Sequence, residues 1–173
     1  MNSMLSTCHT SSPLGEMLLV ANPQGDALAG VYFERQKYFP VNAGRWREAP
    51  LLPLFRETVA QLRAYFAGER TAFDIPLAPA GTSFQRDVWS AIAGVPFGAT
   101  ITYAELARRC GRPSATRAAG AATGRNPVTL IIPCHRIVGS DGALTGYAGG
   151  VDRKRALLAL ESRHAVGAAR KVA

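Results

Sequence analysis

The chain has 173 residues, of which 47% are apolar, and a formal net charge of +8. This length and composition predict one or two folded domains and exclude a largely disordered chain. The longest apolar runs, residues 17–21 and 128–133, fall far short of the roughly 20 residues that a membrane helix needs. Three widely spaced cysteines exclude a disulfide scaffold and a four-cysteine zinc site, and no secretory signal is visible. We therefore expect an intracellular protein without a bound metal.

Charge is distributed unevenly along the chain. Residues 1–81 carry seven basic and seven acidic side chains, whereas residues 82–173 carry thirteen basic and five acidic ones. Seventeen of the twenty basic residues are arginine, the side chain best suited to pairing with phosphates. A neutral half joined to a basic half is typical of a protein whose second half binds a polyanion. An arginine-rich composition with a solvated basic surface explains the same charge equally well.

The first half predicts a small sheet with one helix. Residues 17–21 and 27–33 are extended segments separated by turn residues 22–25, which indicates a hairpin. Residues 35–50 show no period and are expected to form a loop. Apolar residues then recur at helical spacing, which predicts a helix that ends at Gly68: Phe55, Val59, Leu62 and Phe66. Prolines and a glycine between residues 76 and 81 place a domain boundary near residue 80.

The second half predicts a series of helices with clear start signals. Thr82 is followed three residues later by Gln85, and Thr102 by Glu105, which is the pattern of a capping box. Ser114 is expected to cap a third helix that reaches about Gly124, and a last helix spans about residues 152–163. The second and third of these helices resemble a helix-turn-helix. The third consists almost entirely of small residues, which suits either close approach to another surface or tight packing inside its own domain.

The residues best suited to chemistry follow an apolar, strand-like run. Pro133 ends that run, and Cys134, His135 and Arg136 come directly after it. A thiol beside a basic or cationic group is favoured as the nucleophilic thiolate. A buried, inert cysteine is the alternative. Because successive strand residues point to opposite faces, Cys134 and His135 meet directly only if the chain turns at Pro133, unless a water bridges them.

The other two cysteines lack such surroundings. Cys8 lies in the N-terminal segment beside His9, and Cys110 lies at a predicted helix end. Structural roles are expected for both.

The segment Pro133-Cys134-His135-Arg136, preceded by Asn126-Pro127-Val128, resembles the active-site signature of the O6-alkylguanine-DNA alkyltransferases, which repair DNA. The resemblance is strong over about residues 82–162 and loose before that, at residues 12–15 and 65–68. Further family segments occur in the same order and at the same spacing: Thr102-Tyr103, Thr116-Arg117-Ala118-Ala119-Gly120, Tyr147-Ala148-Gly149-Gly150 and Glu161. The resemblance implies a two-domain α/β fold. Residues 1–80 form a ribonuclease-H-like domain, residues 82–165 a mostly helical domain with the helix-turn-helix, and residues 166–173 a disordered tail.

The resemblance also implies a role for each matching residue. Cys134 is the alkyl acceptor, His135 takes the thiol proton through a water, and Glu161 orients His135. Asn126 holds the turn before the active-site strand, and Tyr103 donates a hydrogen bond to the departing guanine. The residues implied to contact DNA are Thr116, Arg117, Ala118, Ala119, Gly120 and Arg125, of which Arg117 fills the gap left by the extruded base. The residues implied to line the alkylguanine pocket are Tyr103, Thr123, Thr129, Ile137, Tyr147, Ala148 and Gly149.

The function that the resemblance implies is direct repair of double-stranded DNA. The protein moves an alkyl group from O6-alkylguanine, and from O4-alkylthymine as well, to its own cysteine. It flips the base through the minor groove, acts once as a monomer, and needs no cofactor. A bacterial, cytoplasmic location at the nucleoid follows. Several relatives have proline where Thr129 stands and a larger residue where Thr123 stands, so a roomier or more polar pocket is expected here.

Two other functions compete with this one. A helix-turn-helix protein that recognises damaged DNA without chemistry would not need Cys134 or Glu161. A hydrolase that uses cysteine and histidine would not need a basic helix-turn-helix, and it would turn over.

The charge asymmetry predicts the salt dependence of DNA binding. Binding to undamaged duplex should weaken steeply as salt rises, because released counterions drive it. A filter-binding or anisotropy titration over a salt series measures the slope. A fragment of residues 1–81, whose net charge is zero, should show no measurable binding. Strong, salt-sensitive binding by that fragment would contradict the assignment of DNA binding to the second half.

Overall fold

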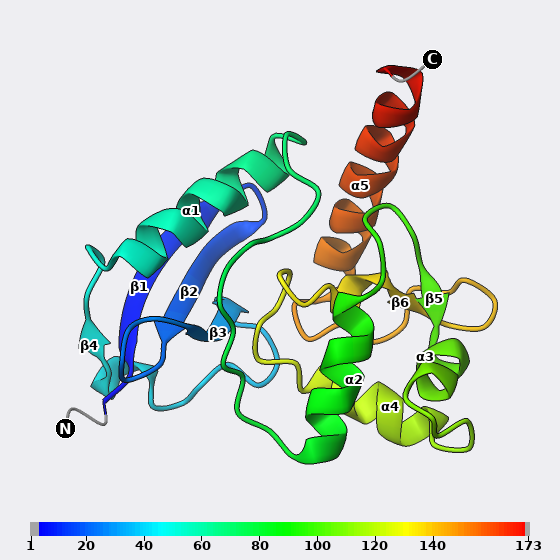
Figure 1. Cartoon of the computed structure of the whole chain (residues 1–173), viewed down its shortest axis with the longest axis horizontal. Helices are drawn as coiled ribbons and strands as arrows, with labels where there is room; N and C mark the ends of the chain where they lie inside the picture. The colour runs from blue at the N-terminus through cyan, green and yellow to red at the C-terminus, as the bar shows by residue number, and fades with distance from the viewer. Residues whose placement is uncertain (1–3, 172–173) are drawn as a thin grey trace. The chain divides into compact units, whose positions relative to one another are not determined.

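The computed structural model describes the backbone of residues 4–171 and the side chains of residues 4–165. It divides into two compact units (Figure 1). Unit 1 comprises residues 1–80 and Pro127–Ile131, and unit 2 comprises Gly81–Asn126 and Ile132–Ala173. Both helices and strands are present, which confirms the α/β class. No helix within the described residues is long and apolar enough to cross a membrane.

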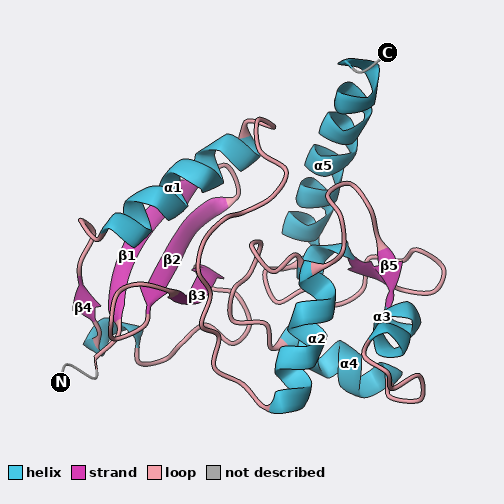
Figure 2. Ribbon diagram, viewed as in Figure 1, coloured by secondary structure: helices cyan, strands magenta, loops and turns pink. Residues whose placement is uncertain are grey.

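A four-stranded sheet forms the centre of unit 1, in the order β3-β2-β1-β4 (Figure 2). Its strands are β1 (Ser6–Ser12), β2 (Gly15–Ala21), β3 (Leu28–Phe33) and β4 (Arg47–Glu48). The β2–β3 pair is the predicted hairpin, and in its turn the Asn22 side chain accepts hydrogen bonds from the amides of Gly25 and Asp26. β1 pairs antiparallel with β2 and parallel with β4. The loop expected at residues 35–50 contains β4 and the short 3-10 helix η1 (Ala43–Arg45).

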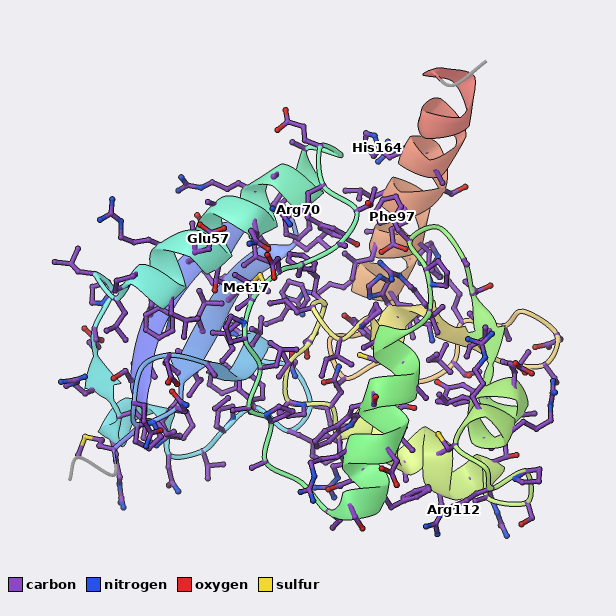
Figure 3. The ribbon with its side chains drawn as sticks, viewed as in Figure 1. Met17, Glu57, Arg70, Phe97, Arg112 and His164 are labelled. Atoms are coloured by element: carbon purple, nitrogen blue, oxygen red, sulfur yellow. The ribbon has the colours of Figure 1, made fainter. Side chains whose placement is uncertain are left out.

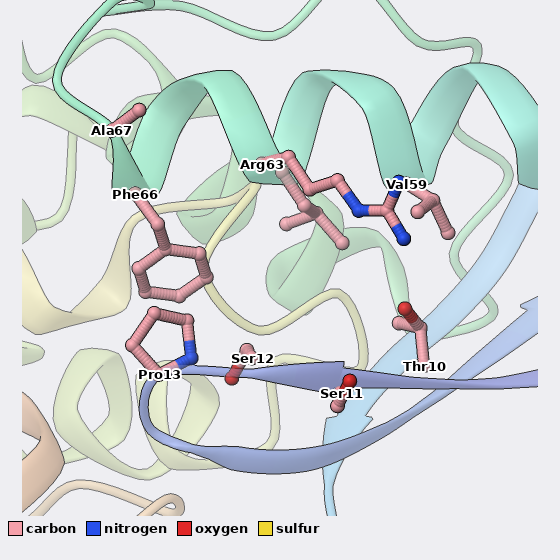
Figure 4. Close-up of a pocket in the computed structure, with 9 residues that line it drawn as sticks. Thr10, Ser11, Ser12, Pro13, Val59, Arg63, Phe66 and Ala67 are labelled. Carbon is pink, nitrogen blue, oxygen red and sulfur yellow. The ribbon is translucent and has the colours of Figure 1, made fainter.

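The helix α1 (Pro53–Phe66) packs along β1 and β2 within unit 1 (Figure 1). Phe55 and Leu62 are buried, as their helical spacing predicted. The other two apolar positions, Val59 and Phe66, are only partly buried. They line a cavity of about 320 Å³ between α1 and the β1–β2 turn, together with Pro13 and the exposed Arg63 (Figure 4).

Residues 127–131 join unit 1 although they come from the second half of the chain. The amide of Val31 donates to Pro127 O at 2.8 Å, and the amide of Thr129 donates to Val31 O at 3.0 Å. The predicted strand is reduced to a single bridge, Val31 with Val128. Leu130 explains this difference, because its φ of 77° is left-handed and cannot continue a strand. The chain returns to unit 2 at Ile132.

Unit 2 consists of four α-helices and short connecting elements: α2 (Ser83–Ala93), β5 (Ile101–Thr102), α3 (Tyr103–Arg109), α4 (Thr116–Gly124), η2 (Cys134–Arg136), β6 (Ile137–Val138) and α5 (Val151–Lys171). The capping box at Thr82 and Gln85 is confirmed, with both hydrogen bonds present. At Thr102 only the hydroxyl half forms, because the Glu105 side chain pairs with Arg108 and Arg109 instead.

The helix α4 corrects one prediction and settles one alternative. Its N-cap is Ala115, which has no side-chain acceptor, so Ser114 is not the cap. Ala119 and Ala122 are buried, and the indole of Trp89 on α2 donates to Ala122 O at 2.9 Å. The opposite face, which includes Arg117, is exposed. The small residues therefore serve close packing inside unit 2 on one face and leave a low, open surface on the other.

The last helix is longer than the sequence predicted. α5 is described as far as Lys171 instead of ending near Arg163. The tail expected to be disordered, residues 166–173, therefore begins inside the helix. The end of that tail, residues 172–173, lies outside the described residues.

Candidate active site

Cys134 lies where the chain turns sharply. Pro133 has a φ of −81° and a ψ of 63°, and the three residues after it form η2. The amide of Cys134 donates to Ile132 O at 2.8 Å, which tightens the turn. Cys134 is 4% exposed and His135 is completely buried. The chain therefore turns at Pro133, as direct contact between the Cys134 and His135 side chains would require.

Asn126, which follows α4, is hydrogen-bonded to the turn that carries the cysteine. Its side-chain amide donates to Ile132 O at 2.8 Å and to the sulfur of Cys134 at 3.2 Å. Asn126 is 3% exposed, so both bonds are shielded from water. A buried N–H aimed at sulfur stabilises the thiolate more than the thiol, because it interacts with the negative charge.

Glu161 on α5 is the buried centre of the site, with no exposed surface. Its Oε1 lies 2.7 Å from Nε2 of His135 and accepts from Nη2 of Arg136 at 2.9 Å. Its Oε2 accepts from Nε of Arg136 at 2.9 Å and from the backbone amide of Gly98 at 3.1 Å. Burial alone would raise the pKa of Glu161, but the hydrogen bonds and positive charges of His135 and Arg136 hold it at about 2. The side chain is therefore a carboxylate at neutral pH.

The protonation of His135 follows from that of its partner. Burial lowers the pKa of His135, and the neighbouring Glu161 opposes this only in part. The ring is therefore neutral near pH 7. A carboxylate can only accept a hydrogen bond, so Nε2 carries the ring proton and Nδ1 is left as the acceptor. Nδ1 is buried and has no hydrogen-bond partner among the described residues. This nitrogen can take a proton from a group or water placed beside it.

Lys154 is part of the site although the sequence analysis did not select it. It is fully buried on α5, and its ammonium donates to the backbone oxygens of Ile137 and, at 3.0 Å, of Thr145. Burial lowers its pKa, and the charge of Cys134 opposes this shift, as expected for a cation near the sulfur. A signal existed in the sequence. Lys154, Leu157 and Glu161 have helical spacing and form one buried face of α5.

The residues predicted to line the alkylguanine pocket belong to both units. The hydroxyl of Tyr103 donates to the backbone oxygens of Thr145 and Gly146, at 3.3 and 3.4 Å. The rings of Tyr147 and His135 meet edge to face at 6.5 Å between centroids. Four other predicted pocket residues belong to unit 2 and are buried or partly buried: Thr123, Ile137, Ala148 and Gly149. Thr129 instead belongs to unit 1, where its hydroxyl lies 3.4 Å from the Gln36 side chain.

Most of the residues predicted to contact DNA lie on the outer face of α4 or at its end. Arg117, Ala118 and Arg125 are exposed, and Thr116 and Gly120 are partly exposed. Ala119 is the exception, because it is fully buried on the inner face of the helix. The prediction for Ala119 is therefore wrong as a surface contact. It follows the exposed Arg117 by two residues, about 200° around the helix, and so lies against the interior of unit 2.

The remaining cysteines and the cavity of Figure 4 stand apart from this chemistry. Burial is the main cause that raises the pKa of both Cys8 and Cys110, which favours the thiol over the nucleophilic thiolate at each. The cavity beside α1 is lined by residues 10–13, 59, 62, 63, 66 and 67, and none of these is a candidate site residue.

Comparison with protein families gives two matches that together span most of the chain. The model of the ribonuclease-like domain of 6-O-methylguanine DNA methyltransferase matches residues 7–79. The model of the DNA-binding domain of the same enzyme matches residues 83–163. These matches confirm the two-part fold predicted from the sequence.

Individual relatives agree with the family models. The methylated-DNA–protein-cysteine methyltransferase of Mycolicibacterium paratuberculosis is 48% identical over 153 residues, which cover 88% of this chain and 90% of the relative. The protein of the same name from Methanosarcina acetivorans is 47% identical, over 87% of this chain and 94% of the relative.

Among solved structures, Mycobacterium tuberculosis OGT in complex with DNA has a TM-score of 0.86 and 43% identity, and the match covers 92% of this chain and 94% of that one. The Mycobacterium tuberculosis O6-methylguanine methyltransferase has a TM-score of 0.85 at the same identity, over 93% and 94% of the two chains. The chain therefore belongs to the methylated-DNA–protein-cysteine methyltransferases, a family of DNA-repair enzymes with a DNA-binding domain, as its sequence predicted.

Proposed function

We propose that this DNA-repair methyltransferase transfers the alkyl group of O6-alkylguanine in double-stranded DNA irreversibly to its own Cys134, and that each molecule acts once. The observation that carries the proposal is the set of buried hydrogen bonds around that sulfur and the residue that follows it. Asn126 donates to Sγ at 3.2 Å, and the next residue, His135, is bound to the Glu161 carboxylate at 2.7 Å. A nucleophile, a base and a group that orients the base are thus adjacent.

The cysteine loses its proton to His135. Nδ1 of His135 is the bare ring nitrogen, and a water between it and Sγ carries the proton across. Glu161 holds the opposite nitrogen, so the ring cannot turn its N–H toward the sulfur. The Asn126 amide then stabilises the thiolate that forms.

The transfer step exchanges two bonds. The thiolate attacks the alkyl carbon, a C–S bond forms, and the bond between that carbon and O6 of guanine breaks. The electron pair of the broken bond goes to the purine, which takes up the proton released from Cys134 and leaves as guanine. Burial raises the pKa of Tyr103, so its hydroxyl stays protonated, and it turns from the Thr145 and Gly146 oxygens to donate its hydrogen bond to the departing base. The product is a thioether, which water does not cleave, so no cofactor is used and the protein is consumed.

Access to the alkyl group requires the base to leave the duplex, at a cost of a few kcal/mol. The exposed face of α4 enters the minor groove, where its small side chains fit the narrow space. Arg117 enters the base stack and replaces the flipped nucleotide. Tyr147, Ala148 and Gly149, with Thr123 and Ile137, enclose the base. O4-alkylthymine is accepted in the same way, and the protein acts as a monomer at the bacterial nucleoid.

The two units divide this work. Residues 82–165 hold the DNA-binding helices and the reacting groups. Residues 1–80 support them, in part because their sheet binds residues 127–131, which connect Asn126 to Ile132 and so to the cysteine turn.

Replacing the nucleophile should abolish transfer and leave DNA affinity almost unchanged. We expect Cys134→Ser to remove no O6-methylguanine from duplex DNA, because a serine hydroxyl next to a neutral imidazole is a far weaker nucleophile than a thiolate. Intact-mass spectrometry and peptide mapping after incubation with the damaged duplex are the measurements. The wild-type protein should gain one methyl group, on Cys134.

The matched control is Cys110→Ser, which changes a second free cysteine of the same unit. It should transfer as the wild type does. Each competing function has its own result in this experiment. A protein that binds damage without chemistry gains no mass, and a hydrolase releases product repeatedly without a stable adduct. Repair by Cys134→Ser would refute the nucleophile assignment.

Arg117→Ala should slow transfer from duplex DNA much more than transfer from single-stranded DNA or from free O6-benzylguanine. In a duplex the arginine compensates part of the flipping cost, on the order of a few kcal/mol. A single strand or a free base has no stack to repair. Single-turnover rates on the three substrates measure the difference.

Arg56→Ala, which removes an exposed arginine from α1 in unit 1, serves as the control and should change none of these rates. An equal loss on duplex and single strand would identify Arg117 as a phosphate contact instead. An equal loss on all three substrates would indicate a damaged fold.

A further inference from the structure

Arg136 uses its whole guanidinium inside unit 2. Nε and Nη2 donate to the two oxygens of Glu161, and Nη1 donates to Val95 O at 2.6 Å. The guanidinium carbon lies 5.8 Å from the centre of the Phe97 ring, which stands beside α5 (Figure 3). Arg136 is 6% exposed. A cation at this depth is costly unless paired, so its pairing to the carboxylate must be close to complete.

A backbone amide also donates to Glu161. Gly98 reaches Oε2 because its φ is +76°, a left-handed conformation that favours glycine. A Cβ at this position would lie 2.7 Å from the Cβ of Ala165 on α5. The carboxylate thus receives His135, both ends of the Arg136 fork and Gly98, and these come from η2 and from the loop that follows α2.

We propose that Arg136 is a positioning residue for alkyl transfer: by holding both oxygens of Glu161, it keeps this carboxylate from stabilising a second proton on His135 and so leaves Nδ1 able to act as the base. The proposal rests on the proposed function. It assigns to Arg136 a control over the protonation state of His135, which is an effect separate from packing.

The chemistry of the carboxylate supports this role. An unpaired carboxylate next to imidazole is a strong acceptor and stabilises the doubly protonated ring. Here Arg136 donates to both oxygens of Glu161, and its positive charge opposes a second positive charge on the ring. After Cys134 gives up its proton, His135 holds it only briefly, and the proton passes to the leaving purine. Arg136 thus favours the return of His135 to its neutral form.

The surroundings of His135 contain charges of both signs. Burial is the largest cause that lowers its pKa, Glu161 raises it, and Arg136 and Lys154 lower it further. The titratable and charged groups that face it or its partners come from η2, α3, α5 and the loop before α5: Cys134, Arg136, Tyr103, Lys154, Glu161 and Tyr147. Removal of the Arg136 charge therefore raises the pKa of His135 and leaves more of the base protonated at a given pH.

The test is the pH profile of alkyl transfer from free O6-benzylguanine to full-length protein, a substrate that makes no demand on DNA binding. We expect Arg136→Met to move the acid limb of the profile upward, on the order of one pH unit. This limb reports the titration of Cys134 and His135 as a coupled pair. The rate should therefore be lowest relative to wild type at acid pH and recover as pH rises.

Arg136→Lys provides a second variant if Arg136→Met does not fold. Lysine keeps the charge but cannot hold both carboxylate oxygens as a fork, so the same upward shift should appear with smaller size. The matched control is Arg155→Met, which removes an exposed arginine of α5 that pairs with Asp152, and its profile should match the wild type.

A purely structural role for Arg136 predicts a different outcome. Loss of packing lowers the active fraction equally at every pH, and a thermal unfolding curve reports that loss separately. A uniform loss, or an unchanged profile in the variant that folds, would overturn the proposal. Failure of the wild-type protein to gain the benzyl group on Cys134 would overturn the proposed function instead, so the two failures are distinguishable.

Discussion

The burial of one carboxylate governs the arrangement of unit 2. Glu161 has no exposed surface, and an isolated ion at that depth would be strongly destabilising. The fold must therefore bring donors to it. Arg136 and His135 reach it because the chain turns into η2 after Pro133, and Gly98 reaches it through a left-handed backbone conformation in the loop after α2. The same bend carries Cys134, the residue directly before the histidine. Stability and reactivity depend on the same turn.

A second constraint acts on the other side of the cysteine. Asn126 is hydrogen-bonded to both Ile132 O and the sulfur of Cys134, and it closes a loop whose middle, residues 127–131, belongs to unit 1. The two ends of this excursion lie in unit 2. A buried asparagine without these partners would leave its amide unsatisfied, so the hydrogen bonds hold the ends together. Within unit 1, Leu130 has left-handed backbone angles, which fit an irregular segment and not a sheet strand.

The sequence predicted those features that local chemistry decides. The capping box at Thr82 and the β2–β3 hairpin rest on contacts between residues close in sequence, and the apolar face of α1 follows from its helical spacing. β1 was not predicted, because its serines and threonines show no apolar alternation, although three of its residues are buried in the sheet.

Features that depend on distant contacts were harder to predict. A lysine on a helix usually faces solvent, and only the folded structure shows the Lys154 ammonium bonded to Ile137 O and Thr145 O. The contact of the Thr129 hydroxyl with the Gln36 side chain in unit 1 joins residues far apart in the sequence and was not predicted. The motif around Cys134 could be found because its residues are adjacent. The donors to Glu161 come from two separate segments, and no spacing in the sequence relates Gly98 to Glu161.

Glu161 fixes His135 as a neutral ring with its proton on Nε2. The most direct test is nitrogen NMR of wild-type protein labelled in its histidines, with His9 and His164 assigned by substitution to glutamine. We expect the His135 ring to stay neutral, with a protonated Nε2 and a bare Nδ1, as the pH falls through the ordinary pKa of histidine. A proton on Nδ1 at neutral pH, or a doubly protonated ring there, would contradict it.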